Sequence, residues 1–176
     1  MTTIDPRYPI GKFEPQDSYT SEDVKININR IAALPEKMKK ALHGLSDAQL
    51  DTPYRDDGWT VRQVVHHVPD SHMNAYIRFK WSLTEDSPLI KAYDEKGWAV
   101  TPETSGPPSI STDLLTALHA KWTVLLKGLS TEDLRRDFTH PDTKKLVPLD
   151  RLIATYAWHG EHHLAHITSL KERMKW

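Results

Sequence analysis

The stretch Trp158-His159-Gly160-Glu161-His162-His163-Leu164-Ala165-His166-Ile167 holds four of the ten histidines in the chain. A second stretch, Val65-His66-His67-Val68-Pro69-Asp70-Ser71-His72, holds three more. Histidines scattered over a protein surface would not gather in two short segments, and neutral imidazole is the commonest metal ligand. We therefore expect the fold to bring the two stretches together as a nitrogen-rich metal site.

Length and composition indicate one domain spanning residues 1–176. The formal net charge of −1 gives no electrostatic footprint for nucleic acid or an anionic membrane. We find no apolar run long enough to span a bilayer and no signal-peptide pattern. The chain has no cysteine, which excludes disulfides, thiolate ligands and a cysteine nucleophile. These features predict a cytoplasmic protein that binds neither nucleic acid nor membrane.

Apolar residues at helical spacing predict four long helices behind an irregular N-terminal arm, residues 1–20. We find no convincing strand. The pattern is typical of an all-α four-helix bundle with a long irregular loop between the second and third long helices. Cap residues and helix stops place the helices from Ser21 to Gly44, from Thr60 to about Thr84, from Ser111 or Thr112 to Gly128, and from near Pro148 to the basic C-terminal end.

Two prolines interrupt this pattern. Pro35 predicts a kink or a break of the first helix into two, because proline removes a backbone donor and clashes with the preceding turn. Pro69 either re-aims the neighbouring histidines or curves the second helix around the core. The loop from Thr84 to Ser111 carries Tyr93 and Trp98, which indicate that part of it is ordered over a site or at a subunit interface.

The segments 44–50 and 128–134 have a similar pattern, a glycine helix stop followed by a short capped turn. Each precedes a loop and then a histidine-bearing helix. We interpret them as parts of two helical hairpins of similar construction, related by approximate internal symmetry. Chance recurrence of a common capping pattern is the alternative.

Helical periodicity of about 100° per residue identifies the inward histidines of the last helix. His163 lies nearly within its apolar stripe, and His159 lies at the edge of the stripe. His166 lies further out, and His162 points well away. The inward pair is spaced i and i+4, which puts two imidazoles on one face, one turn apart.

The second helix is ambiguous by the same test. His72 is central in its stripe, whereas His66 and His67 lie to either side. Pro69 makes the helical register unreliable here, so residue patterns alone leave the third ligand open between these histidines. Three neutral histidines suit zinc, nickel or ferrous iron and leave one coordination position for water or substrate.

The chain resembles the DinB-like superfamily of metal-binding helical bundles, and within it the YfiT-type metal-dependent hydrolases, also described as bacillithiol S-transferases. The resemblance extends across nearly the whole chain. The stretches that carry it are Tyr8-Pro9-Ile10-Gly11, residues 50–55, Gly58 to His67, residues 70–74, Tyr93-Asp94-Glu95, His140-Pro141-Asp142 and Trp158 to Ile167.

The resemblance implies His67, His159 and His163 as the ligands of one Zn²⁺, Ni²⁺ or Fe²⁺ per chain, with His72 as second choice. It also implies a cytoplasmic homodimer. Pro69 departs from the family pattern, which puts the local geometry around the first ligand in question.

These features support three functional hypotheses. The first is a hydrolase that acts on a small molecule, in which the cation lowers the pKa of bound water toward about 7. No general base is evident, although Asp70 could orient a ligand imidazole.

The second hypothesis is a thiol S-transferase that uses a small thiol such as bacillithiol as cosubstrate. Arg55, Arg62 and Arg78 could hold an acidic cosubstrate, although surface ion pairing is their commoner role. The third hypothesis is a non-enzymatic metal-binding sensor or interaction module.

Overall fold

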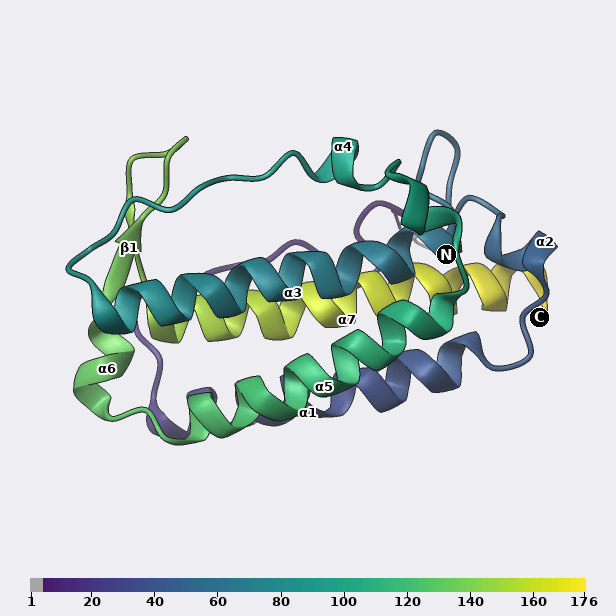
Figure 1. Ribbon diagram of the computed structural model, residues 1–176. Coiled ribbons are helices and arrows are strands. Elements are labelled where there is room, and N and C mark those ends of the chain that lie inside the picture. Colours follow the sequence, from purple (N-terminus) through teal and green to yellow (C-terminus); the bar gives the residue numbers. More distant parts are fainter. Residues whose placement is uncertain (1–4) are drawn as a thin grey trace.

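The computed structural model describes residues 5–176 and has four long helices lying side by side (Figure 1). Each is amphipathic and turns its apolar face toward the others, so the predicted all-α four-helix bundle is confirmed. The helices are α1 (Ser21–Leu42), α3 (Val61–Thr84), α5 (Pro108–Lys127) and α7 (Leu149–Met174).

Consecutive long helices are not always neighbours in this bundle. Both α1 and α3 pack against α5 and α7, whereas α1 and α3 lie diagonally opposite, as do α5 and α7. The chain therefore crosses the bundle diagonally at one end between α1 and α3, and at the opposite end between α5 and α7 (Figure 1). This order places α3 beside α7, the two helices that carry the histidine stretches (Figure 1).

The connections contain six short elements, which are α2 (Asp47–Leu50), α4 (Glu95–Trp98), η1 (Pro102–Ser105), α6 (Thr131–Arg135), β1 (Asp137–Thr139) and β2 (Leu146–Pro148). The two strands form an antiparallel hairpin in which Phe138 is opposite Val147. Sequence analysis found no convincing strand and so missed this hairpin. Strands of three residues are too short to produce a readable alternation.

The predicted similarity between the segments 44–50 and 128–134 is present. The short helix α2 follows α1, and α6 follows α5. Ser46 with Gln49, and Ser130 with Asp133, form complete capping boxes at the start of these short helices. The diagonal crossings at the two ends of the bundle thus begin in the same way, with a short capped helix.

Several helix boundaries differ from those expected. Thr20 rather than Ser21 caps α1, and Pro35 lies inside a helix that is not broken in two. The helix α5 begins at Pro108, earlier than Ser111 or Thr112, because proline is well suited to a first helical position. Thr60 caps α3 as expected, and α3 continues through Pro69.

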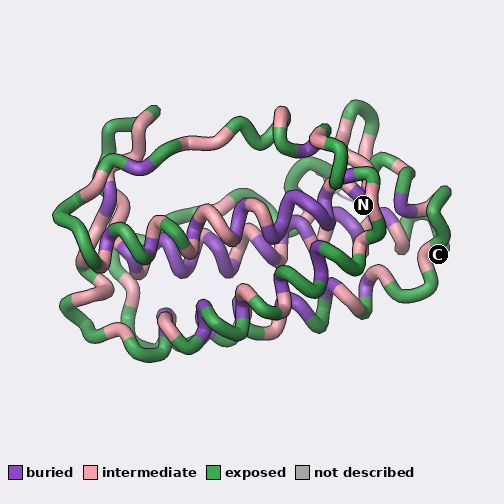
Figure 2. Tube along the Cα trace, viewed as in Figure 1, coloured by how far each residue is buried: buried purple, intermediate pink, exposed green. Residues whose placement is uncertain are grey.

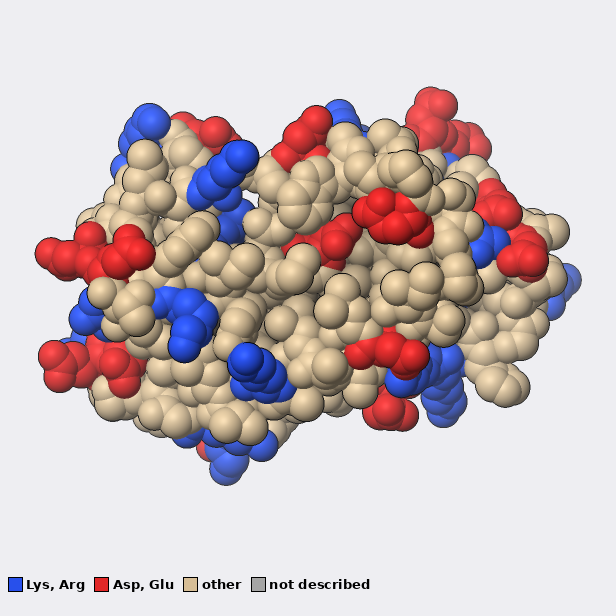
Figure 3. Space-filling view, viewed as in Figure 1, with Lys and Arg blue, Asp and Glu red and all other residues tan. Residues whose placement is uncertain are grey.

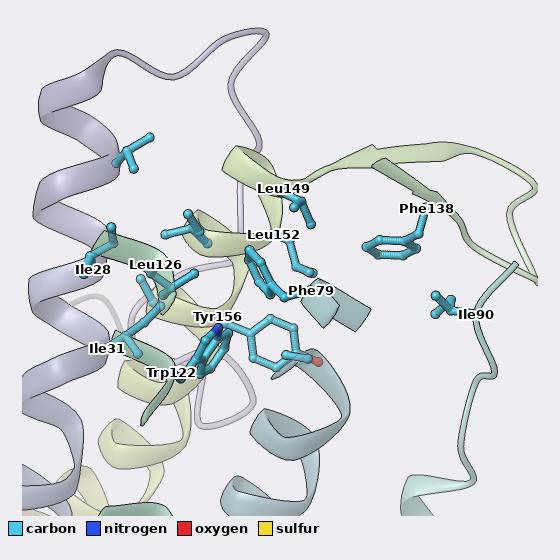
Figure 4. Packing of buried hydrophobic residues seen from close by; sticks show 14 residues of the cluster. Ile28, Ile31, Phe79, Ile90, Trp122, Leu126, Phe138, Leu149, Leu152 and Tyr156 are labelled. Carbon is cyan, nitrogen blue, oxygen red and sulfur yellow. The ribbon is translucent and has the colours of Figure 1, made fainter. Parts of the chain in front are cut away.

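The buried side chains form two apolar clusters, one toward each end of the bundle. The first contains Phe79, Trp122 and Tyr156 (Figure 4), and the second contains Leu115 and Ile167. Burial runs along the inner face of every long helix (Figure 2). Between the two clusters lies a polar level formed by histidines of α3, α5 and α7.

Basic and acidic side chains are interspersed over the face seen in Figure 3, as expected for a nearly neutral chain. Across residues 5–176, no helix combines the length and apolar character needed to cross a bilayer.

Candidate metal centre

Three histidines converge where α3 and α7 face each other. Each of His67, His159 and His163 offers a ring nitrogen, and these nitrogens all lie within 4.8 Å of one another. The Nε2 atoms of His67 and His159 are 3.4 Å apart. One helix contributes two of the rings because residues four apart project from the same face, and the adjacent helix contributes the third.

The donors fit a divalent cation. Two nitrogens bound at 2.0–2.1 Å in a tetrahedral zinc site would be about 3.3–3.4 Å apart, which matches the His67–His159 spacing. Burial lowers the pKa of His67 to about 4 and lowers the pKa values of His159 and His163 well below the ordinary range. The rings are therefore neutral at physiological pH, the form in which imidazole binds a metal.

The other two histidines of the stretch in residues 65–72 lie outside this cluster. The Nδ1 of His66 is 2.7 Å from Oγ of Ser111 and its Nε2 is 3.3 Å from the Gly106 carbonyl, so this ring links α3 to α5 and the long loop. His72 is fully buried, and its Nε2 lies 3.2 Å from Nδ1 of His159. The apolar periodicity correctly put His72 at the bundle centre, but the three-histidine cluster lies off that axis.

The helical wheel misjudged the remaining histidines of α7. His162 and His166 were expected to point outward, yet both are buried. The N-terminal arm and the 51–60 loop cover them. Tyr8 of the arm lies 6.1 Å from His162 between ring centroids, and Tyr54 stacks on His166 at 4.0 Å. Periodicity within one helix cannot reveal a covering segment from elsewhere in the chain.

Asp70 is half-buried, and burial together with Glu103 raises its pKa to about 6. Within residues 5–176, its carboxylate forms no hydrogen bond with a histidine ring, and the contact with Nδ1 of His159 comes from His72 instead. Glu161 pairs with Arg30 of α1 at 2.6 Å. Neither carboxylate therefore orients a ring of the cluster.

The three arginines considered at the sequence level have different surroundings. Arg62 is buried and pairs with Asp51 and Asp47 at 2.6 and 2.8 Å, so it holds the bundle end together. Arg55 lines the cavity above the histidine cluster. Arg78 lines a second cavity and lies 3.5 Å from the Tyr156 hydroxyl.

The histidine cluster lies at the wall of a cavity of about 810 Å³. Aromatic rings and charges of both signs line it, including Tyr54, Trp59, Arg7, Arg55, Lys96, Asp57 and Glu95. A second cavity of about 490 Å³ lies along the same helices and includes Tyr93, Tyr156 and His140. His159, Glu95 and Lys96 border both cavities, so within the histidine cluster the ring of His159 lies at the boundary between the two.

Sequence analysis missed three residues around the cluster. The ring of Trp59 lies 4.7 Å from that of His67 between centroids. Oγ of Ser71 is 3.4 Å from Nε2 of His159, and His119 contacts His72. A signal existed for His119, since it lies between the buried Leu115 and Trp122 in the apolar stripe of α5.

A four-helix bundle with imidazoles converging between two facing helices defines a class of helical proteins built to hold a metal. This chain belongs to the DinB superfamily, whose family model matches residues 30–167.

The chain is 49% identical over 177 residues to YfiT of Bacillus subtilis, named "Putative metal-dependent hydrolase", covering 100% of this chain and 99% of that protein. A protein of Bacillus cereus with the same designation is 52% identical over 172 residues, covering 98% of this chain and 99% of the relative. The resemblance to YfiT-type proteins is thereby confirmed.

Solved structures agree with this placement. That of Bacillus subtilis YfiT, described as a four-helix bundle of unusual topology, superposes with a TM-score of 0.95 at 49% identity and covers 97% of this chain and 98% of that chain. A mycothiol-dependent maleylpyruvate isomerase superposes with a TM-score of 0.60 at 15% identity, covering 82% of this chain and 63% of that one. The second likeness is one of fold.

Proposed function

We propose that this protein is a metal-dependent hydrolase of small polar molecules, with His67, His159 and His163 as the ligands of one cation per chain. The observation that carries the proposal is the convergence of three neutral imidazoles at the wall of a cavity large enough for a substrate. The name of the 49% identical relative supports the hydrolytic assignment. Imidazole ligands suit Zn²⁺, with Ni²⁺ and Fe²⁺ as alternatives.

A bound divalent cation would supply Lewis acidity, lowering the pKa of a water molecule and polarising a carbonyl group. The chain's own residues would position the reactants. The Trp59 ring packs against the His67 ring in a tilted arrangement, with the centroids 4.7 Å apart, and covers part of it. Arg7, Arg55 and Lys96 at the cavity wall would bind anionic groups of a substrate, while Asp57 and Glu95 would bind cationic ones.

Metal content of untagged protein, measured by mass spectrometry, tests the site. We expect about one metal per chain in the wild type and loss of the metal in His163→Ala. His162→Ala is the matched control, because the His162 ring is as buried as that of His163 but lies outside the three-histidine cluster. This variant should keep the metal. A folded wild type that takes up neither zinc nor nickel would refute the proposal, as would equal loss in both variants.

Metal-loaded wild type would then be assayed against a panel of small amides and esters, with His163→Ala as the inactive control. Turnover in the wild type alone supports the hydrolase. A site that binds metal tightly but hydrolyses nothing and has no exchangeable water would favour the sensor hypothesis instead.

A second candidate function is thiol S-transfer, favoured by the two cavities that share His159, Glu95 and Lys96. Two reactants could approach the centre through the two cavities, one being a small thiol such as bacillithiol and the other an electrophile. Arg55 and Arg78 lie at the walls of different cavities, where either could bind an acidic cosubstrate. Conjugate formed only with added thiol would identify this reaction. Homodimer formation remains a prediction.

A further inference from the structure

A row of hydrogen-bonding atoms runs from the histidine cluster through the bundle to α1. Nδ1 of His159 lies 3.2 Å from Nε2 of His72, and Nδ1 of His72 lies 2.9 Å from Nε2 of His119. Nδ1 of His119 then lies 2.7 Å from the backbone carbonyl of Ile31. Helices α7, α3, α5 and α1 each contribute one group to this row.

The carbonyl at the far end sets the direction of every bond. A carbonyl oxygen only accepts, so Nδ1 of His119 must carry a proton. A neutral His119 ring then has a bare Nε2, which accepts from Nδ1–H of His72. By the same step, Nε2 of His72 is bare and accepts from Nδ1–H of His159. His159 is left with a bare Nε2, the atom that faces His67.

Pro35 explains why the Ile31 carbonyl is available. In a regular helix that oxygen would accept from the N–H of the residue four positions later, which here is Pro35, and proline has no N–H. His119 supplies the missing donor from α5. The helix-interrupting residue of α1 and the buried histidine of α5 are thus parts of one arrangement.

Burial favours this row of neutral histidine rings over one that contains a protonated ring. His72 and His119 are almost completely inaccessible to solvent, and within residues 5–176 no carboxylate contacts either ring. A protonated imidazolium in this layer would be costly. Neutral rings that donate in one direction satisfy both nitrogens of each histidine without a charge.

We propose that His72 and His119 are positioning residues that fix the Nδ1–H tautomer of His159 and so keep its Nε2 free to bind the cation. The proposal rests on the metal site proposed above. Without an acceptor at position 119, His72 would be free to take the opposite tautomer and donate from Nε2. The proton of His159 would then move to Nε2, the ligand atom itself.

Zinc affinity, measured by competition with a chelator on the full-length protein, tests this proposal. His119→Phe keeps an aromatic ring but removes the acceptor, and we expect it to weaken zinc binding about ten- to hundredfold, the range usual for groups that support a ligand histidine. His119→Gln restores an acceptor toward His72 and should recover most of the affinity. A merely space-filling role for His119 would give the opposite ranking.

Trp122→Phe is the matched control. Trp122 packs against both His72 and His119, with ring centroids 5.8 Å away, but takes no part in the row of hydrogen bonds. It should lower stability toward urea without changing zinc affinity. If wild type binds zinc and His119→Phe binds it within about twofold, the inference fails while the proposed function stands. If wild type binds no metal, both fail.

Nitrogen-15 NMR of the zinc-loaded wild type gives a second test that needs no variant. The two ring nitrogens of a neutral histidine differ strongly in shift, so the tautomer is read directly. We expect His72 and His119 to be protonated at Nδ1. An Nε2–H tautomer at His119 would contradict the proposed direction of the hydrogen bonds, even if His119→Phe fails to fold.

Discussion

Asp70 shows how a single buried group opposes stability at neutral pH. Its pKa is raised to about 6 from an ordinary value near 3.8, first by burial and then by Glu103. The folded state therefore holds the Asp70 proton more tightly than the unfolded state. The stability contributed by this carboxyl group is present below pH 3.8 and is lost as pH rises through 6.

Asp70→Asn should consequently stabilise the metal-free protein at pH 7.5, by on the order of 1 kcal/mol once the partial exposure of the group is considered. At pH 4 the gain should largely vanish. Urea unfolding at the two pH values measures this, with exposed Asp86→Asn as the control. An equal gain at both pH values would mean that the ionisation of Asp70 is not the cause.

At the same scale, the sequence predicted two members of the candidate site and left a third open. The i and i+4 spacing of His159 and His163 gave a shared helix face. Apolar periodicity placed His72 at the centre of its stripe, but Pro69 left the third ligand open, and the family resemblance pointed to His67. The structure explains the conflict: His72 lies on the bundle axis behind His159, whereas His67 lies at the cavity. A hydrophobic stripe locates the core, not the edge of a cavity.

At the scale of single elements, α7 approaches α1 closely because Gly160 has no side chain. A Cβ atom there would collide with the buried Leu34 of α1 and lie 3.4 Å from Cε1 of His72. Gly160 also directly follows His159. The close contact of these two helices thus helps to place the histidines of the cluster.

Gly160→Ala should destabilise the protein by about 1–2 kcal/mol, since overpacking a core costs about 1–3 kcal/mol and the gain in helix propensity returns at most about 1. Urea unfolding of the single variant and of the Leu34→Ala double variant tests the cause. Leu34→Ala makes room, so adding Gly160→Ala in that background should cost little. An undiminished cost would point to a contact other than Leu34.

The long helices were predictable because each carries many apolar residues at one period, and capping boxes marked the start of α3. Helix boundaries that depend on tertiary contacts could not be predicted from the sequence. Pro35 did not break α1, because its lost hydrogen bond is replaced from α5. The hairpin of β1 and β2 escaped detection because three-residue strands depend on partners that the local sequence does not reveal.

At the scale of the whole molecule, the buried histidine layer ties stability to pH. Burial lowers the pKa of His119 to about 4, and the groups facing its ring, His72 of α3 and the Ile31 carbonyl of α1, are uncharged. Below pH 6.5 the unfolded state binds a proton here that the folded state does not. Stability is therefore full above pH 6.5 and is lost as pH falls toward 4.

We expect the free energy of unfolding of the metal-free protein to fall between pH 7 and pH 4.5, with His119 contributing up to about 1.4 kcal/mol per pH unit in that window. Urea titrations at several pH values measure the fall. His119→Gln removes one titrating ring and should flatten the curve. A profile that is level across this range, or unchanged by the substitution, would contradict the prediction.

The replaced hydrogen bond at Pro35 also has a consequence for the order in which the chain folds. In a peptide of residues 21–42 only water could donate to the Ile31 carbonyl, and a short helix containing proline is marginal in water. We therefore expect the middle of α1 to become fully helical only together with the packing of α5, whose His119 replaces the missing donor. Formation of this helix would then be coupled to a tertiary contact across the bundle.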